Sequence, residues 1–95
     1  MRLPKEQIIF IKTSIKNILP VSKIYLFGSR VYDDKKGGDI DILVLSDRLL
    51  NSEEKRKIKI SFHKKFGEQK IDIVSFCFND NDSFKQLILT EAIEL

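Results

Sequence analysis

The sequence contains a single cysteine, Cys77, and no tryptophan. One cysteine cannot form a disulfide within the chain or supply a cysteine-based zinc site, and it is typical of proteins in a reducing compartment. No stretch approaches the roughly 18 consecutive apolar residues of a membrane-spanning helix, and the first residues form no apolar run of signal-peptide length. We therefore expect a cytoplasmic protein that does not insert into a membrane.

The chain carries only a small excess of positive charge. Seventeen lysine and arginine residues stand against fourteen aspartate and glutamate residues, so the net charge is +3. This weak positive charge suits a triphosphate or an acidic protein surface as well as a nucleic acid. Because no interleaved aromatic and basic residues form a platform for stacking bases, we do not expect a nucleic acid partner. The 95 residues, 42% of them hydrophobic, are sufficient for one domain spanning 1–95.

Apolar periodicity and turn residues predict alternating helices and strands. The expected helical segments are 4–19, a short turn at 30–32, a helix that begins at Asn51–Glu54 and closes at Gly67, and a last helix from Phe84 to the C-terminus. The expected strands are 23–27, 39–45 and 70–78. The strand at 39–45 is apolar on both faces, with Leu43 and Leu45 on one and Ile40, Ile42 and Val44 on the other. Such a strand is central and covered by helices, so we predict an α/β (α+β) fold with a small mixed sheet of three or four strands.

Two aspartates, Asp39 and Asp41, open the clearest strand. Alternate side chains of a strand share a face, so these carboxylates lie on one side, roughly 6.5–7 Å apart along the chain. Two such carboxylates repel each other unless a cation sits between them. The preceding turn, Gly28–Ser29, can present backbone N–H groups to a phosphate. Together these features predict a site for a divalent metal ion and a triphosphate.

A third carboxylate, Asp72, lies inside the predicted strand at 70–78. A lone carboxylate in such a position is costly unless it is paired, bound to a metal or placed at the margin of the sheet. If this strand lies beside the strand at 39–45, Asp72 can face the same side as Asp39 and Asp41. Three clustered carboxylates suit one or two Mg²⁺ ions. Two ions about 4 Å apart can activate an attacking hydroxyl group and stabilise a leaving pyrophosphate.

The order of these motifs resembles the DNA polymerase beta-type nucleotidyltransferase superfamily, and within it the minimal nucleotidyltransferases. The resemblance rests on Leu26-Phe27-Gly28-Ser29-Arg30, on Gly38-Asp39-Ile40-Asp41 after a spacing of about ten residues, and on Asp72 in a later strand. It extends over essentially the whole chain and implies the polymerase beta-like nucleotidyltransferase fold. No separate domain for binding a base or a template fits in a chain of this length.

The resemblance also implies roles for individual residues. Gly28 and Ser29 would hold the β- and γ-phosphates of the nucleotide, and Arg30 would lie near these phosphates. Asp39 and Asp41 would bind two Mg²⁺ ions. Asp72 would bind the catalytic ion and help to deprotonate the acceptor hydroxyl group.

Minimal nucleotidyltransferases are often paired with a helical HEPN-domain protein. Known members include protein adenylyltransferases that modify this partner and act as the antitoxin of a toxin–antitoxin pair. By this resemblance, we expect an Mg²⁺-dependent nucleotidyltransferase that transfers AMP from ATP to a hydroxyl group of a partner protein. The residues themselves specify neither the base of the donor nor the acceptor.

Several alternatives remain open from the residues alone. The aspartates at 39 and 41 could be solvated, Asp72 could be paired with Lys70 or another lysine, and Arg30 could cover the end of the sheet. The loop Asp33–Gly38 is polar, and its lysines are expected to be solvated. Another class of function is a binding module, weakly catalytic or inactive, that neutralises a helical partner by masking it. An apolar helix face could be buried in a homo- or hetero-oligomer.

Overall fold

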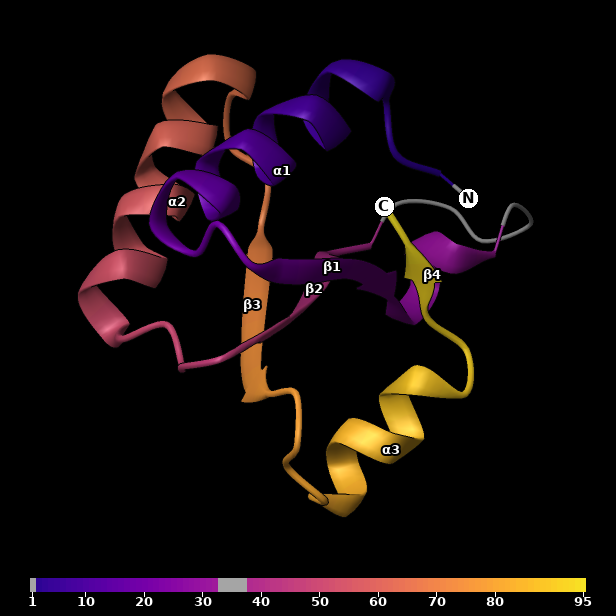
Figure 1. Cartoon of the computed structure of the whole chain (residues 1–95). Coiled ribbons are helices and arrows are strands. Elements are labelled where there is room, and N and C mark those ends of the chain that lie inside the picture. The colour runs from indigo at the N-terminus through magenta and orange to yellow at the C-terminus, as the bar shows by residue number, and fades with distance from the viewer. Residues whose placement is uncertain (1, 33–37) are drawn as a thin grey trace.

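The computed structural model describes residues 2–32 and 38–95, so the predicted loop Asp33–Gly38 lies outside them except for Gly38. In chain order the elements are α1 (Lys5–Ile18), β1 (Ser22–Phe27), the 3-10 turn η1 (Gly28–Val31), β2 (Ile40–Ser46), α2 (Ser52–Phe66), β3 (Ile71–Cys77), α3 (Ser83–Leu89) and β4 (Ile93–Glu94) (Figure 1). None of the helices in the described ranges is long and apolar enough to cross a membrane.

The strands form one mixed sheet in the order β3-β2-β1-β4. β1 runs antiparallel to both β2 and β4, whereas β2 and β3 are parallel. A parallel pair needs a long crossover connection, and α2 provides it between β2 and β3. The predicted mixed sheet is therefore confirmed, with β2 as an interior strand.

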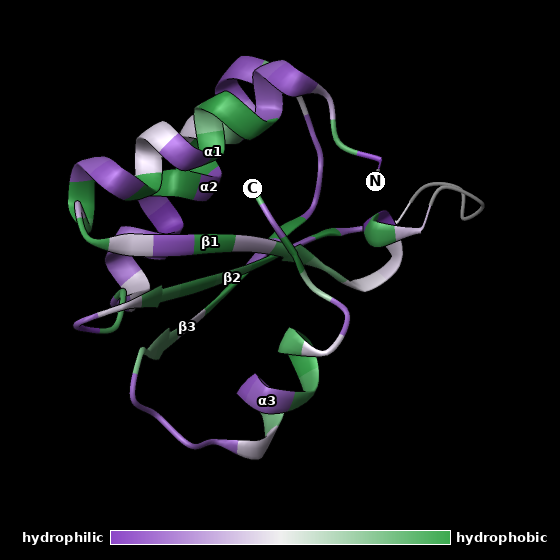
Figure 2. Ribbon diagram, turned by 45° about the vertical axis from the view of Figure 1, so that its right-hand side comes forward, coloured by the Kyte–Doolittle hydropathy of each residue, from purple (hydrophilic) through white to green (hydrophobic). Residues whose placement is uncertain are grey.

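Helices cover both faces of the sheet. α1 and α2 lie on one face and α3 lies on the other (Figure 2). The α1/α2 face buries Ile40, Ile42 and Val44 of β2, while the α3 face buries Leu43 and Leu45 together with Ile88 of α3. The two-faced apolar pattern of β2 therefore predicted its central position correctly.

The end of the chain differs from the prediction. α3 ends at Leu89 instead of continuing to the C-terminus, and Ile93 and Glu94 pair with Leu26 and Tyr25 of β1. The Thr90 hydroxyl group donates a hydrogen bond to the Leu87 carbonyl at 2.7 Å, which satisfies a carbonyl at the helix end. The free edge of β1 then pairs with the last residues, a long-range interaction that the helical spacing of Ile88 and Ala92 does not reveal.

The start of α2 matches its sequence signals. The Asn51 side chain accepts a hydrogen bond from the Glu54 N–H at 2.8 Å, and the Glu54 side chain accepts one from the Asn51 N–H at 3.0 Å. This reciprocal pair is a capping box, which satisfies backbone donors at the helix N-terminus. Arg48 contacts the same Glu54 carboxylate through both terminal nitrogens, each at 2.9 Å.

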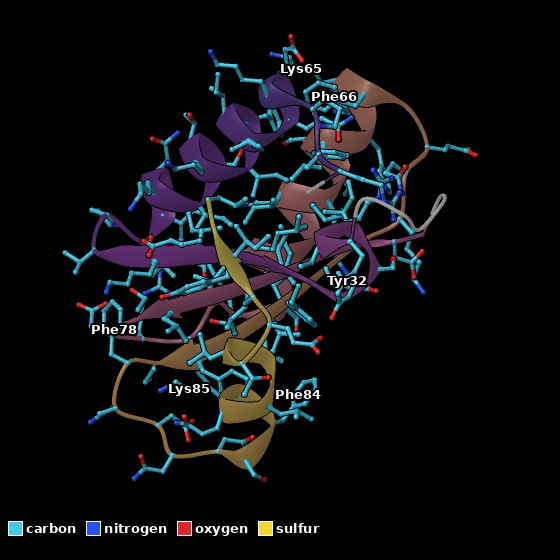
Figure 3. The ribbon with its side chains drawn as sticks, turned by 90° about the vertical axis from the view of Figure 1, so that its right-hand side faces the viewer. Tyr32, Lys65, Phe66, Phe78, Phe84 and Lys85 are labelled. Carbon is cyan, nitrogen blue, oxygen red and sulfur yellow. The ribbon has the colours of Figure 1, made fainter. Side chains whose placement is uncertain are left out.

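α3 is held against the end of β3 by a buried lysine, Lys85 (Figure 3). Its ammonium group donates hydrogen bonds to the carbonyls of Cys77 at 3.2 Å, Phe78 at 2.7 Å and Asp80 at 2.7 Å. The Asp82 carboxylate caps the helix by accepting from the Phe84 N–H at 2.8 Å. These contacts fix the position of α3 over its face of the sheet.

Candidate active site

The turn that follows β1 brings two glycines against polar side chains. Gly28 has φ +77°, and a β-carbon there would collide with the Asp41 carboxylate. Gly38 has φ +91°, and a β-carbon there would collide with the Ser29 hydroxyl group. Glycine is therefore required twice, because it tolerates a positive φ and leaves room for the neighbouring group. The predicted phosphate turn and the predicted carboxylates are direct neighbours.

The three predicted aspartates lie at one end of two adjacent strands. Asp41 is paired in register with Asp72 of the parallel strand β3 and, on its other side, with Phe27 of β1. Asp39 immediately precedes β2. Residues alternate in a strand, so Asp41 and Asp72 share the face that carries Leu43, which is the face covered by α3. The expectation that Asp72 lies beside Asp41 is confirmed.

The carboxylates repel one another. The pKa of Asp41 is raised above its usual 3.8, first because burial penalises its charged form and then because Asp72 and Asp39 carry like charges. The nearby Lys70 acts in the opposite direction. A cation held among these groups would relieve the repulsion.

In this structure, the ammonium groups of two lysines lie beside the aspartate carboxylates and partly offset their negative charge. The Lys70 ammonium lies 3.4 Å from an Asp39 carboxylate oxygen and 3.9 Å from an oxygen of Asp72. The Lys59 ammonium lies 4.0 Å from the other oxygen of Asp72. The alternative in which Asp72 is paired with Lys70 is thus also present. Lys70 directly precedes β3, and Asp72 is the second residue of that strand. This i, i+2 spacing is the sequence signal for their proximity.

The donor chemistry suits a divalent metal ion. Carboxylate oxygens are the ligands that Mg²⁺ prefers, and three carboxylates offer them at one end of the sheet. Among residues 2–32 and 38–95, no three acidic, histidine or cysteine side chains are already drawn together closely enough to hold a metal ion. The residues therefore fit the ion by type and position, and binding would require the side chains to turn from the lysines toward one another.

Arg30 is engaged with the backbone around the turn. Its guanidinium donates to the carbonyl of Arg2 at 2.9 Å, to the carbonyl of Gly38 at 3.4 Å and to the Gln69 side chain at 3.2 Å. Arg2 in turn donates to the Ser29 carbonyl at 3.0 Å. Arg30 therefore links the backbone of Arg2 and Gly38 with the Gln69 side chain. Arg2 and Gln69 were not predicted as part of this region, because their partners are distant in the sequence.

Comparison with known proteins places these features in a family. The family model described as "Polymerase beta, Nucleotidyltransferase" matches residues 10–95. The chain is 24% identical over 87 residues to a Haemophilus influenzae protein named "Probable protein adenylyltransferase MntA", covering 90% of this chain and 75% of that protein.

Solved structures show the same fold. A crystal structure of a mutant MntA–HpeT toxin–antitoxin complex contains a chain that matches with a TM-score of 0.71 at 20% identity, covering 97% of this chain and 71% of that one. A structure of a tri-AMPylated Shewanella oneidensis HEPN toxin in complex with an MNT antitoxin matches with a TM-score of 0.61 at 23% identity, covering 93% of this chain and 70% of that one. The match of the family model to most of the chain, on a fold with the glycine–serine turn and paired aspartates in place, shows that this protein belongs to the polymerase beta nucleotidyltransferase family.

Proposed function

We propose that this protein transfers AMP from ATP to a hydroxyl group of a HEPN-type partner protein, with Mg²⁺ as cofactor, and so acts as the antitoxin of a toxin–antitoxin pair. The observation that carries the proposal is the register of Asp41 with Asp72 directly beside the Gly28 turn. Residues 1–95 would act as one catalytic domain in the cytoplasm, where the free thiol of Cys77 is stable.

Some of the site residues would bind the phosphates of the nucleotide, and others would act on the acceptor hydroxyl group. Backbone N–H groups of Gly28 and Ser29 would hold the β- and γ-phosphates, with Arg30 keeping the turn in place. The acceptor oxygen would attack the α-phosphorus, and the bond from the α-phosphorus to the bridging oxygen would break, releasing pyrophosphate. Asp72 would orient the acceptor hydroxyl group and help to remove its proton. Two Mg²⁺ ions held by Asp39, Asp41 and Asp72 would supply charge neutralisation for the triphosphate and the leaving group.

The relatives support this assignment. One relative carries the name of a protein adenylyltransferase. A structural neighbour is the MNT partner of an AMPylated HEPN toxin. Nucleotidyl transfer depends mainly on positioning and charge neutralisation. The Gly28 turn would supply the first, and the three aspartates with their metal ions would supply the second.

The test is transfer of labelled AMP from ATP, in Mg²⁺, to the protein encoded beside this one, with both proteins co-expressed. We expect transfer by the wild type and a loss of at least about 100-fold in the double variant Asp39→Asn, Asp41→Asn. Asp47→Asn is the matched control, because Asp47 is exposed and follows the other end of β2. No labelling with any nucleotide, or equal labelling by the double variant, would refute the proposal.

Masking of a partner is the second candidate function. The large apolar side chains Ile9 of α1 and Ile60 of α2 are 54% and 44% exposed, so apolar surface is available for a protein to cover. The two functions can be separated by measuring whether the double aspartate variant still neutralises the partner. A masking protein would still protect, whereas an enzyme would not.

A further inference from the structure

A cavity of about 210 Å³ lies between the Gly28 turn and α3. Its lining residues are Phe27, Gly28, Phe84, Leu87, Ile88 and Glu91. Phe27 is the register partner of Asp41, so the cavity lies on the same face of the sheet as the carboxylates. Figure 3 shows Phe84 projecting from α3 on the side of the molecule that carries Tyr32, next to η1.

The lining is mostly apolar, and the described residues that form it include no basic side chain. Phe84 and Leu87 are 51% and 67% exposed, which is high for large apolar side chains beside a polar site. Glu91 is the one ionisable residue among the described lining residues, and its negative charge disfavours a phosphate there. The volume is below the roughly 300–1,000 Å³ of a typical small-molecule pocket, so the cavity suits part of a ligand, such as a flat ring.

A second, larger cavity of about 490 Å³ lies elsewhere on the surface, away from the Gly28 turn. The described residues that line it all belong to α1: Ile9, Lys12, Thr13, Lys16 and Asn17. It shares no residue with the turn or the aspartates. The smaller cavity is the one connected to the predicted chemistry, because Gly28 belongs both to its wall and to the phosphate turn.

We infer that this cavity holds the nucleoside part of the triphosphate, with the base against Phe84 and Leu87. The inference rests on the proposed function, since it takes the phosphates to be bound at Gly28 and Ser29. A nucleotide fixed there by its phosphates must place its nucleoside nearby, and the cavity offers the adjoining apolar surface. Contact with the α3 side chains would remove apolar surface from water, and this burial would add affinity that inorganic phosphates cannot gain.

The experiment compares ATP with inorganic tripolyphosphate, each titrated calorimetrically into the full chain in the presence of Mg²⁺. We expect Leu87→Ala and Phe84→Ala each to weaken ATP binding about tenfold, because the bound base would cover apolar surface that these side chains now expose. The same variants should bind tripolyphosphate within about twofold of the wild type. Leu49→Ala is the matched control, because Leu49 is 52% exposed and lies beyond the far end of β2.

The outcomes separate this inference from the proposed function. Unchanged ATP binding in both α3 variants, together with weakened ATP binding in the double aspartate variant, would overturn the inference and leave the function standing. Equal weakening of ATP and tripolyphosphate would also overturn it, because the defect would then lie in the phosphate site. Absence of ATP binding by the wild type would overturn both. Leu87 is 67% exposed, so Leu87→Ala remains informative if Phe84→Ala folds poorly.

Discussion

Gly28 lies so close to Asp41 that any β-carbon at position 28 would collide with the Asp41 carboxylate. We predict that Gly28→Ala abolishes nucleotidyl transfer, with a loss of at least about 100-fold, because the carboxylate must move and the turn must give up its positive φ. The variant should also unfold more easily, by roughly 1–3 kcal/mol. Labelled transfer and urea denaturation measure the two effects.

Gly67 provides the matched control for this substitution. Its φ of +86° is similar, but among the described residues beyond its two chain neighbours, no atom lies within 4 Å of the position that a β-carbon would take. Gly67→Ala should therefore lower stability through backbone strain alone and leave transfer intact. If both variants lost transfer equally, the close approach of Gly28 to Asp41 would not explain the defect.

The raised pKa of Asp41 predicts how the metal-free protein responds to pH. The folded state holds this proton more tightly than the unfolded chain, whose value is near 3.8. As the pH rises from 3.8 through the folded pKa, the folded state must ionise a carboxyl that is partly buried and lies beside the charges of Asp72 and Asp39. The free energy of unfolding therefore falls across this window. Asp41→Asn should raise the Tm of the metal-free protein at neutral pH by roughly 2–4 °C, allowing for solvent screening.

A divalent metal ion should favour the wild type over Asp41→Asn in thermal stability. Added Mg²⁺ should raise the Tm of the wild type more than that of Asp41→Asn, because the ion binds the carboxylates of the folded state. Differential scanning fluorimetry with chelator and with excess Mg²⁺ checks both statements. A larger Mg²⁺ response in Asp41→Asn would show that Asp41 does not take part in binding the ion.

Lys70 is expected to compete with a metal ion for the carboxylates, because its ammonium lies 3.4 Å from Asp39 and 3.9 Å from Asp72. Lys70→Met should increase the affinity for Mn²⁺ roughly threefold, since exposed ion pairs contribute about 0.2–1 kcal/mol. Electron paramagnetic resonance of free Mn²⁺ measures this without nucleotide. Lys57→Met, which removes only the exposed pair with Glu53, should leave the affinity unchanged. Weaker Mn²⁺ binding by Lys70→Met would contradict this prediction.

Lys85 should be essential for the placement of α3. Lys85→Met would leave the carbonyls of Cys77, Phe78 and Asp80 without this donor, and we expect a loss of about 2–3 kcal/mol in the free energy of unfolding. Lys64→Met, at an exposed position of α2, serves as the control and should change stability by less than about 0.5 kcal/mol. Equal stability of the two variants in urea would show that the buried ammonium contributes nothing.

Glu54 should contribute to acid sensitivity. Its hydrogen bonds to Arg48 and to the Asn51 backbone lower its pKa from 4.5 to about 2. A lowered pKa stabilises the folded state at pH values above 4.5, and this contribution is lost as the pH falls from 4.5 toward 2. Glu54→Gln should therefore be less stable than the wild type above pH 4.5, and the difference should narrow in acid. A difference that stays constant with pH would exclude this origin.

The sequence by itself determined most of the local elements and the positions of the candidate site residues. The apolar alternation of β2, the capping residues Asn51 and Glu54, and the spacing from Gly28 to Asp39 and Asp41 are all encoded within short segments. Local periodicity and capping act over a few residues, so they can be interpreted without knowing the fold.

Only the tertiary structure decided which segments meet. The register that sets Asp41 beside Asp72, the pairing of β4 with β1, the contact of Lys70 with Asp39 and the cavity beneath α3 all join residues far apart in the chain. A one-residue slip of β3 would move Asp72 to the opposite face of the sheet without changing any local pattern. Register is set by burial of both faces of the sheet together, and this collective packing is not written in any one segment.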